Sequence, residues 1–134
     1  MREIKFRVWC KQYEEFIQFN KMGFLEDGSL WYVQGVDENE EEINPPYFEN
    51  QNDWELMQYT DLKDTNGVEI YDGDVIRFIL GDYNIREYVE EVVYSDGAFW
   101  CGNWLLFDAK MNDDDLEVLG NIYENPELLE REAE

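Results

Sequence analysis

Residues 56–76 read LMQYTDLKDTNGVEIYDGDVI, and this stretch decides the fold. Turn residues interrupt its apolar and aromatic residues twice, first at Asn66-Gly67 and again at Asp72-Gly73. Such dipeptides are typical of tight turns between antiparallel strands. Glycine is expected at both turns because a tight turn requires a positive φ, which a residue with a Cβ adopts only at a cost. The stretch therefore predicts a β scaffold and does not indicate a reaction.

The same pattern continues to residue 107. The apolar segments are residues 56–59, 70–71, 75–80, 85–94, 98–100 and 104–107, and a turn signal lies in each gap. Short strands at regular spacing favour a barrel or sandwich. We predict a mostly β fold, either a small SH3-like barrel or a partly open β-barrel, with only strands from Glu55 until the last strand at residues 116–119.

The N-terminal third predicts a β meander. Ile4, Phe6 and Val8 alternate with a second row that ends in Trp9, which predicts a strand with the second row facing outward. Residues 16–19 form another short β segment, and the sequence at residues 26–29 is typical of a hairpin turn. Aromatic residues between positions 47 and 54 are expected to be buried again, in either a short helix or an extended segment.

A short helix is expected at the C-terminus. Asn125 offers an N-cap and Pro126 suits the first helical position, so the helix should run from Pro126 to about Arg131. The 134 residues fit a single domain, with an N-terminal β subregion at about residues 1–52 and a β-barrel subregion at about residues 53–134.

Three blocks of sequence resemble the YopX family, which consists of small phage and prophage proteins of Gram-positive bacteria. The blocks are residues 2–9 (REIKFRVW), residues 56–76 and residues 117–129 (EVLGNIYENPELL), so the resemblance spans the chain. Asp61 stands where relatives usually have glycine, and Cys10 stands where they often have aspartate. The resemblance implies a β architecture and a phage origin. It implies no catalytic residue.

The charge of the chain is strongly negative. Thirty-three Asp and Glu against ten Lys and Arg give a net charge of −23, which argues against direct binding of nucleic acid. The expected partner is an unidentified protein that is basic or electroneutral, and a basic host protein is one candidate. Basic residues are concentrated near the N-terminus, where Lys5 and Arg7 are candidates for contacts between copies in a homo-oligomer.

Two acidic clusters are candidate protein-binding patches. The first lies between Gly35 and Pro46, a segment expected to be a flexible insertion, and contains Asp37, Glu38, Glu40, Glu41 and Glu42. The second contains Asp113, Asp114 and Asp115. Solvated loops without a partner explain both equally well, and a solvated turn is favoured over a cation site for the second. A sharper alternative is that the acidic surface imitates DNA and inhibits a host nucleic-acid-binding protein.

The residue types present favour a protein that is not an enzyme. Without histidine the chain can form no Ser-His-Asp or Cys-His site, and two cysteines cannot form a structural zinc site. Cys10 is expected to be a structural thiol. A hydrolase with paired carboxylates is a distant alternative, and a sugar-stacking platform of Tyr94, Trp100 and Trp104 is less favoured than a role in the core.

The remaining expectations concern cofactors and location. No phosphate-binding glycine loop is present, and we predict no cofactor and no metal. Charged residues among the first seven positions and short apolar runs predict neither a signal peptide nor a membrane span. The expected location is the bacterial cytoplasm, with both thiols reduced.

Overall fold

The computed structural model describes residues 4–11, 13–43, 47–48, 54–81, 83–113 and 115–133. The chain divides into two compact units. Residues 7–56 form the N-terminal unit, and residues 1–6 together with 57–134 form the C-terminal unit. The division of the chain into one domain with two subregions stays a prediction.

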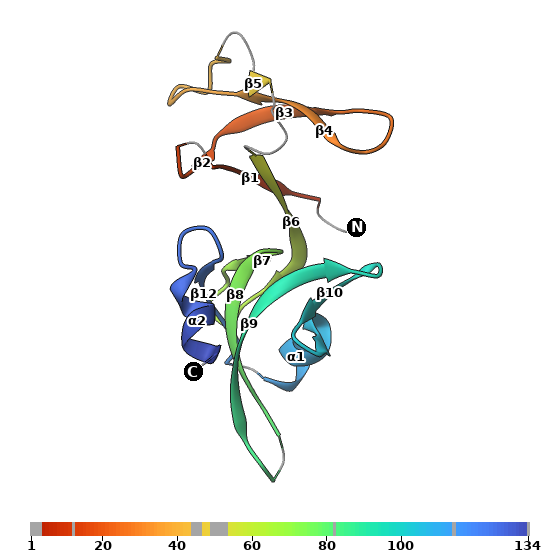
Figure 1. Cartoon of the computed structure of the whole chain (residues 1–134), viewed down its shortest axis with the longest axis vertical. Coiled ribbons are helices and arrows are strands. Elements are labelled where there is room, and N and C mark those ends of the chain that lie inside the picture. Colours follow the sequence, from red (N-terminus) through yellow and green to blue (C-terminus); the bar gives the residue numbers. More distant parts are fainter. Residues whose placement is uncertain are drawn as a thin grey trace. The chain divides into compact units, whose positions relative to one another are not determined.

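In the N-terminal unit, strand β1 (Phe6–Cys10) pairs with β2 (Glu15–Ile17), which places Trp9 opposite Phe16. Strands β3 (Phe19–Phe24), β4 (Leu30–Gly35) and β5 (Tyr47–Phe48) form an antiparallel sheet in that order (Figure 1). The β3–β4 hairpin confirms the predicted turn at residues 26–29.

The predicted outward position of Trp9 is wrong. Val8, Trp9 and Cys10 are all buried, with Trp9 only 5% exposed, whereas Ile4 is exposed. The Trp9 ring packs edge-on against Phe16 at 4.9 Å between centroids. The Trp9 ring is therefore buried, although Trp9 belongs to the row of β1 residues that alternates with the apolar row.

The acidic segment after β4 is folded as far as the structure describes it. The backbone pairs Val36 with Glu42, and the Asp37 carboxylate accepts hydrogen bonds from the N–H groups of Asn39 at 2.9 Å and Glu41 at 3.0 Å. Residues 35–43 thus contain an aspartate-centred turn that satisfies backbone groups, and the flexibility expected for this segment stays a prediction. Residues 44–46 lie outside the described residues.

The C-terminal unit contains a five-stranded antiparallel sheet that curls into a half-barrel (Figure 1). Its strand order is β11 (Trp104–Leu105), β10 (Ala98–Cys101), β9 (Arg86–Ser95), β8 (Asp74–Leu80) and β12 (Glu117–Asn121). The core on its inner face contains Ile70, Ile76, Phe78, Val92, Cys101, Leu106, Ala109 and Leu116. The predicted mostly β fold with a partly open barrel is confirmed.

The stretch at residues 56–76 folds as predicted, and aspartates hold its turns. Strand β6 (Trp54–Lys63) pairs with β7 (Glu69–Tyr71), and Gly67 and Gly73 adopt φ of +82° and +90°. The buried Asp64 carboxylate accepts hydrogen bonds from the N–H groups of Asn66, Val68 and Val118 at 2.8–2.9 Å. Some of the acidic side chains of this unit therefore act as hydrogen-bond acceptors for backbone N–H groups.

The prediction that the chain contains strands and no helix between Glu55 and the last strand is wrong for one segment. Residues 104–105 form β11, but Leu106–Asn112 form helix α1. Leu106 and Ala109 are three positions apart, so one face of the helix buries both in the core. The apolar run at residues 104–107 could not by itself distinguish a strand end from a helix start.

The predicted C-terminal helix is confirmed as α2 (Glu127–Ala133), which begins one residue later than expected. The Asn125 side chain contacts the end of β12. Its Oδ1 accepts a hydrogen bond from the Asn121 N–H at 3.4 Å, and the Asn121 side chain accepts from the N–H groups of Tyr123 and Glu124. These contacts fix the turn between β12 and α2. Helix α2 packs on β9 and helix α1 on β10.

Candidate protein-binding site

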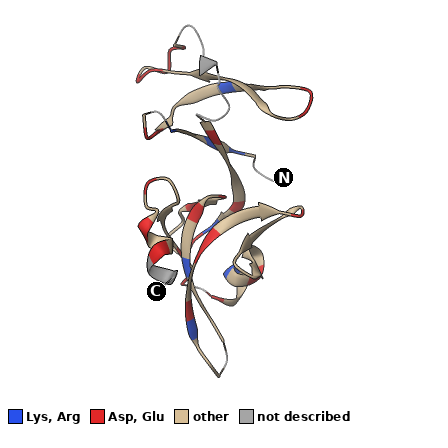
Figure 2. Cartoon of the chain, viewed as in Figure 1, with Lys and Arg blue, Asp and Glu red and all other residues tan. Residues whose placement is uncertain are grey.

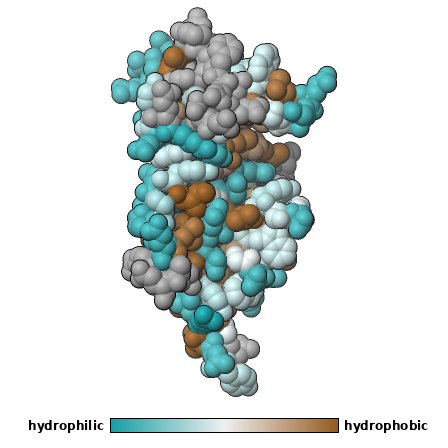
Figure 3. Space-filling model, viewed as in Figure 1, coloured by the Kyte–Doolittle hydropathy of each residue, from teal (hydrophilic) through white to brown (hydrophobic). Residues whose placement is uncertain are grey.

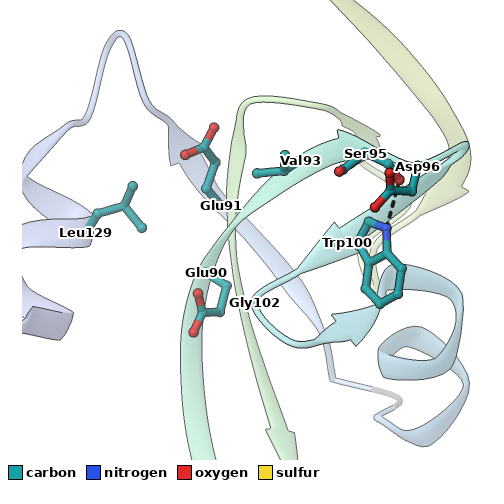
Figure 4. Close-up of a pocket in the computed structure, with 8 residues that line it drawn as sticks. All are labelled: Glu90, Glu91, Val93, Ser95, Asp96, Trp100, Gly102 and Leu129. Carbon is teal, nitrogen blue, oxygen red and sulfur yellow. Dashed lines mark hydrogen bonds between the residues drawn. The ribbon is translucent and has the colours of Figure 1, made fainter.

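An open pocket of about 500 Å³ lies on the outer face of the curled sheet in the C-terminal unit. Strand β9, the β9–β10 turn, strand β10 and helix α2 supply its walls, as Figure 4 shows. Its lining includes three carboxylates, one serine and a small number of apolar groups, namely Glu90, Glu91, Asp96, Ser95, Val93, Trp100 and Leu129. We name it the acidic pocket.

The register of the β9–β10 hairpin places these residues together. Trp100 is opposite Val93, and Ala98 is opposite Ser95, so their side chains share one face. The next pairs, Phe99 with Tyr94 and Cys101 with Val92, belong to the core face. The pocket is therefore a product of cross-strand pairing.

Trp100 is fixed at one end of the acidic pocket. Its indole Nε1 donates a hydrogen bond to the Ser95 carbonyl oxygen at 2.9 Å (Figure 4). Asp96 lies beside it in the turn, with a φ of +53° that is followed by Gly97 at +81°. The hairpin turn therefore holds a carboxylate next to a partly exposed aromatic ring.

The two glutamates of β9 leave the strand in opposite directions, as Figure 4 shows. The Glu90 carboxylate lies against Gly102, where an added Cβ would be 3.0 Å from its Cδ. Burial, with the negative charge of Asp72 as a second cause, raises the pKa of Glu91 above its usual range. The ionised form of Glu91 is therefore disfavoured where it stands, and a nearby cation would favour it.

This arrangement can attract a cation. A lysine or arginine side chain gains from carboxylates and from an aromatic face. Because Glu90 and Glu91 point apart, they do not form the converging pair on which carboxylate-based hydrolysis depends.

The first predicted acidic patch is partly engaged in contacts of its own. Asp37 accepts the backbone hydrogen bonds described above, and Glu42 forms an ion pair with Lys21 at 3.1 Å. Hydrogen bonding to Lys21 lowers the pKa of Glu42. Glu38, Glu40 and Glu41 are exposed in the turn, and Figure 2 shows acidic residues on the loops of this unit.

The second predicted patch does not exist as a continuous surface among the described residues. Asp113 is buried, with 8% of its surface exposed, and it accepts hydrogen bonds from the N–H groups of Ile79 at 2.7 Å and Asp115 at 2.9 Å. The prediction of a solvated Asp113 is therefore wrong, because the carboxylate is a buried acceptor for two backbone donors. Asp115 is exposed, and Asp114 lies outside the described residues.

Both cations proposed for self-association contact their own unit. Lys5 forms an ion pair with Glu69 at 2.7 Å and lies 5.7 Å from the centre of the Tyr59 ring. Arg7 lies over the Phe16 ring at 4.8 Å. A second copy would have to compete with these contacts.

Both cysteines and Trp104, which is one of the three residues of the alternative sugar-stacking platform, belong to the interior. Cys10 and Cys101 are free and buried, and burial together with the Glu90 charge raises the pKa of the Cys101 thiol to about 12. Trp104 packs against Tyr88 at 4.5 Å and Phe78 at 6.0 Å. The core interpretation of Trp104 is confirmed, while Trp100 lines the acidic pocket.

Two further observations concern the described residues alone. Within these ranges no three cysteine or carboxylate side chains gather as a metal site would require. Neither described helix has the length and apolar character needed to cross a membrane.

The comparisons with known proteins concern almost the whole chain. A family model described as YopX protein matches residues 5–130. The chain belongs to the YopX family. The crystal structure of protein EF1440 from Enterococcus faecalis matches this YopX-family chain at 31% identity and a TM-score of 0.72, over 96% of this chain and 99% of that chain.

A second structure, of protein yopX from Bacillus subtilis, matches at 23% identity and a TM-score of 0.62, over 96% of this chain and 98% of that chain. At this identity the likeness shows the fold alone. Comparison with curated proteins gives no match.

One aspartate of this YopX-family chain stands in a strained backbone conformation. Asp61 adopts a φ of +67°. This left-handed conformation is free of strain for glycine and costs energy for a residue with a Cβ. Glycine would therefore adopt the conformation of this position at a lower cost than aspartate does.

Proposed function

We propose that this YopX-family protein is a phage- or prophage-encoded binding module without enzymatic activity, which captures a basic segment of a host protein in the bacterial cytoplasm. The acidic pocket is the observation that supports the proposal. It combines three carboxylates with the partly exposed ring of Trp100.

The physical basis is the attraction of a cation to two kinds of group at once. A cation over an aromatic face contributes about 0.5–1 kcal/mol at an exposed site. Each exposed ion pair adds up to about 1 kcal/mol and weakens with salt. A bound cation would in turn lower the pKa of Glu91, which burial and the Asp72 charge raise.

The test is calorimetric titration of the full chain with hexalysine at low salt. The variant Glu91→Gln/Asp96→Asn removes two charges from the acidic pocket. Its control, Glu38→Gln/Glu41→Gln, removes two charges from an exposed turn of the N-terminal unit. We expect the pocket variant to lose about fivefold or more in affinity, as two exposed ion pairs would imply, and the control to lose less than half as much.

Equal losses in the two variants would overturn the proposal, because they would show that hexalysine senses net charge and no particular pocket. A Trp100→Leu variant adds a second criterion. It keeps an apolar side chain and removes the aromatic face, so affinity should fall without a change in the salt dependence of binding.

DNA mimicry is a second candidate function, and the net charge of −23 favours it. The inhibited partner would then be a host nuclease or repressor whose DNA site the acidic surface occupies. Competition with duplex DNA and a steep loss of binding between about 50 and 300 mM salt are expected. Binding that ignores salt over this range would exclude mimicry.

Self-association through Lys5 and Arg7 is a separate proposal. Light scattering of the wild type and of Lys5→Glu/Arg7→Glu tests it, and a monomer in both would exclude it.

A further inference from the structure

A second pocket, of about 510 Å³, also lies against the β9–β10 hairpin. Strand β6 forms one wall, and β9, β10 and the start of helix α1 form the others. The two pockets share no lining residue. The aromatic pair of this pocket, Tyr94 and Phe99, lies on the opposite face of the hairpin from Val93 and Trp100 of the acidic pocket, because neighbouring residues of a strand point to opposite faces.

The walls of this second pocket are aromatic and aliphatic. The rings of Tyr94 and Phe99 meet edge to face at 5.2 Å, and Leu106, which also lines the pocket, is buried. Tyr94 and Phe107 are 55% and 58% exposed. The volume falls within the range of about 300–1,000 Å³ that is common for ligand pockets. Figure 3 shows hydrophobic side chains interrupting the hydrophilic surface of the C-terminal unit.

One charged group lines the pocket, and it is Asp61. Its side chain is exposed, and among the described residues its carboxylate forms no hydrogen bond or ion pair. The other polar side chains of the lining are Gln58, Thr60 and the Tyr94 hydroxyl, and no lysine or arginine is among the lining residues. The pocket thus presents an apolar cavity with one unopposed negative charge.

We infer that this pocket binds a large apolar side chain of a partner protein whose next residue is lysine or arginine. The apolar side chain fills the space between the aromatic rings, and the cation pairs with Asp61. The inference deepens the proposed function, on which it rests for the basic character of the partner. It assigns a second, chemically different contact point.

Charge complementarity decides the class of occupant. A segment with an acidic residue beside its apolar anchor meets the like charge of Asp61. It also meets a chain of net charge −23, so repulsion opposes its approach. An apolar residue flanked by a cation gains burial and an ion pair together.

The experiment uses the full ¹⁵N-labelled chain and three dipeptide probes. They are Ac-Phe-Arg-NH₂, Ac-Phe-citrulline-NH₂, which keeps the shape of arginine without its charge, and Ac-Gly-Arg-NH₂. We expect saturable amide shifts at Leu62, Phe99 and Leu106 with the two phenylalanine probes only, and about two- to fivefold tighter binding of the arginine probe, as an exposed ion pair provides.

Two variants connect these results to the pocket. Asp61→Asn removes the charge and keeps a residue that tolerates the left-handed conformation, so it should abolish the preference for arginine over citrulline. Phe107→Ser removes an exposed wall and should weaken both phenylalanine probes alike. Superimposable spectra of the free variants establish that they are folded.

Either of two results would overturn the inference. One is the absence of saturable shifts around the pocket with the phenylalanine probes. The other is a preference for arginine that survives Asp61→Asn. Failure here leaves the hexalysine titration unaffected, and failure of hexalysine to sense Glu91 and Asp96 leaves the dipeptide result unaffected, so the two proposals are separately decided.

Discussion

The Asp113 carboxylate accepts a hydrogen bond from the backbone N–H of Ile79 at 2.7 Å, which joins the end of helix α1 to strand β8. Its other oxygen accepts from the Asp115 N–H at 2.9 Å. An acid that composition would assign to the surface is thus a buried acceptor for two backbone donors. Only part of the negative charge is therefore available to a partner.

Replacement of Asp113 by alanine should destabilise the protein by about 1–3 kcal/mol, because two backbone donors lose their acceptor and one of them is in a strand. Asp115→Ala removes the same charge from an exposed position and should change stability by less than about 0.5 kcal/mol. Urea unfolding of both variants measures the difference. Equal effects would mean that charge, and not hydrogen bonding, is the contribution of Asp113.

Asp61 gives a prediction about backbone strain. Its φ of +67° disfavours β-branched residues most, so Asp61→Val should cost about 1–3 kcal/mol. Asp61→Gly relieves the strain but raises the entropy of the unfolded chain, and should change stability by less than about 1 kcal/mol. Thermal unfolding of the two variants provides the test, and a valine variant as stable as the glycine variant would contradict the assigned conformation.

The turns of this fold could be predicted because their chemistry is local. Asn66-Gly67 and Asp72-Gly73 each carry the residue that a positive φ requires, whatever surrounds them. The buried role of Asp113 could not be predicted, because its partner Ile79 is 34 positions away. Burial of a carboxylate depends on which donors the tertiary structure brings to it.

The same distinction applies to the candidate site. Trp100 was apparent as an aromatic residue in a short strand, but its proximity to Glu91 and Leu129 depends on strand register and on where α2 packs. Helix α1 could not be predicted from residues 104–107, because an apolar run of this length fits either a strand or a helix. The spacing of Leu106 and Ala109 was the one signal that could have indicated it.

Gly120 illustrates a requirement for space. A Cβ at this position would lie 2.2 Å from Asn125 Oδ1, so Gly120→Ala should destabilise the turn before α2 by about 1–3 kcal/mol. Asn125→Ala alone loses the hydrogen bond to Asn121. Because it also opens the space, the double variant should be more stable than the sum of the single effects predicts. Strict additivity in a double-mutant cycle would contradict this steric cause.

The cysteines should be unreactive in the folded protein. Both are buried, and the pKa of Cys101 is raised to about 12, so its thiolate is scarce at pH 8. Ellman's reagent should label neither thiol in the native state and both in concentrated guanidinium chloride. Rapid labelling of the folded Cys101→Ser variant, which keeps only Cys10, would contradict the prediction for Cys10. Rapid labelling of the folded Cys10→Ser variant would contradict it for Cys101.

Glu91 should make stability depend on pH. Burial and the Asp72 charge raise its pKa in the folded state, so the folded protein holds this proton more tightly than the unfolded chain does. The contribution of Glu91 to stability therefore decreases as the pH rises from the ordinary glutamate value of about 4.3 through the raised value. Glu91→Gln should accordingly be more stable than the wild type at pH 7, by less than about 1 kcal/mol for a partly exposed group. The advantage should vanish below the ordinary pKa, where both states of the wild type are protonated.

Glu38→Gln, in an exposed turn, is the control, because it removes one charge without burial. Urea unfolding of the wild type and both variants between pH 4 and pH 7 measures the stability differences. A local effect of Glu91 requires that the stability gain of Glu91→Gln exceeds that of Glu38→Gln and grows as the pH rises through this window.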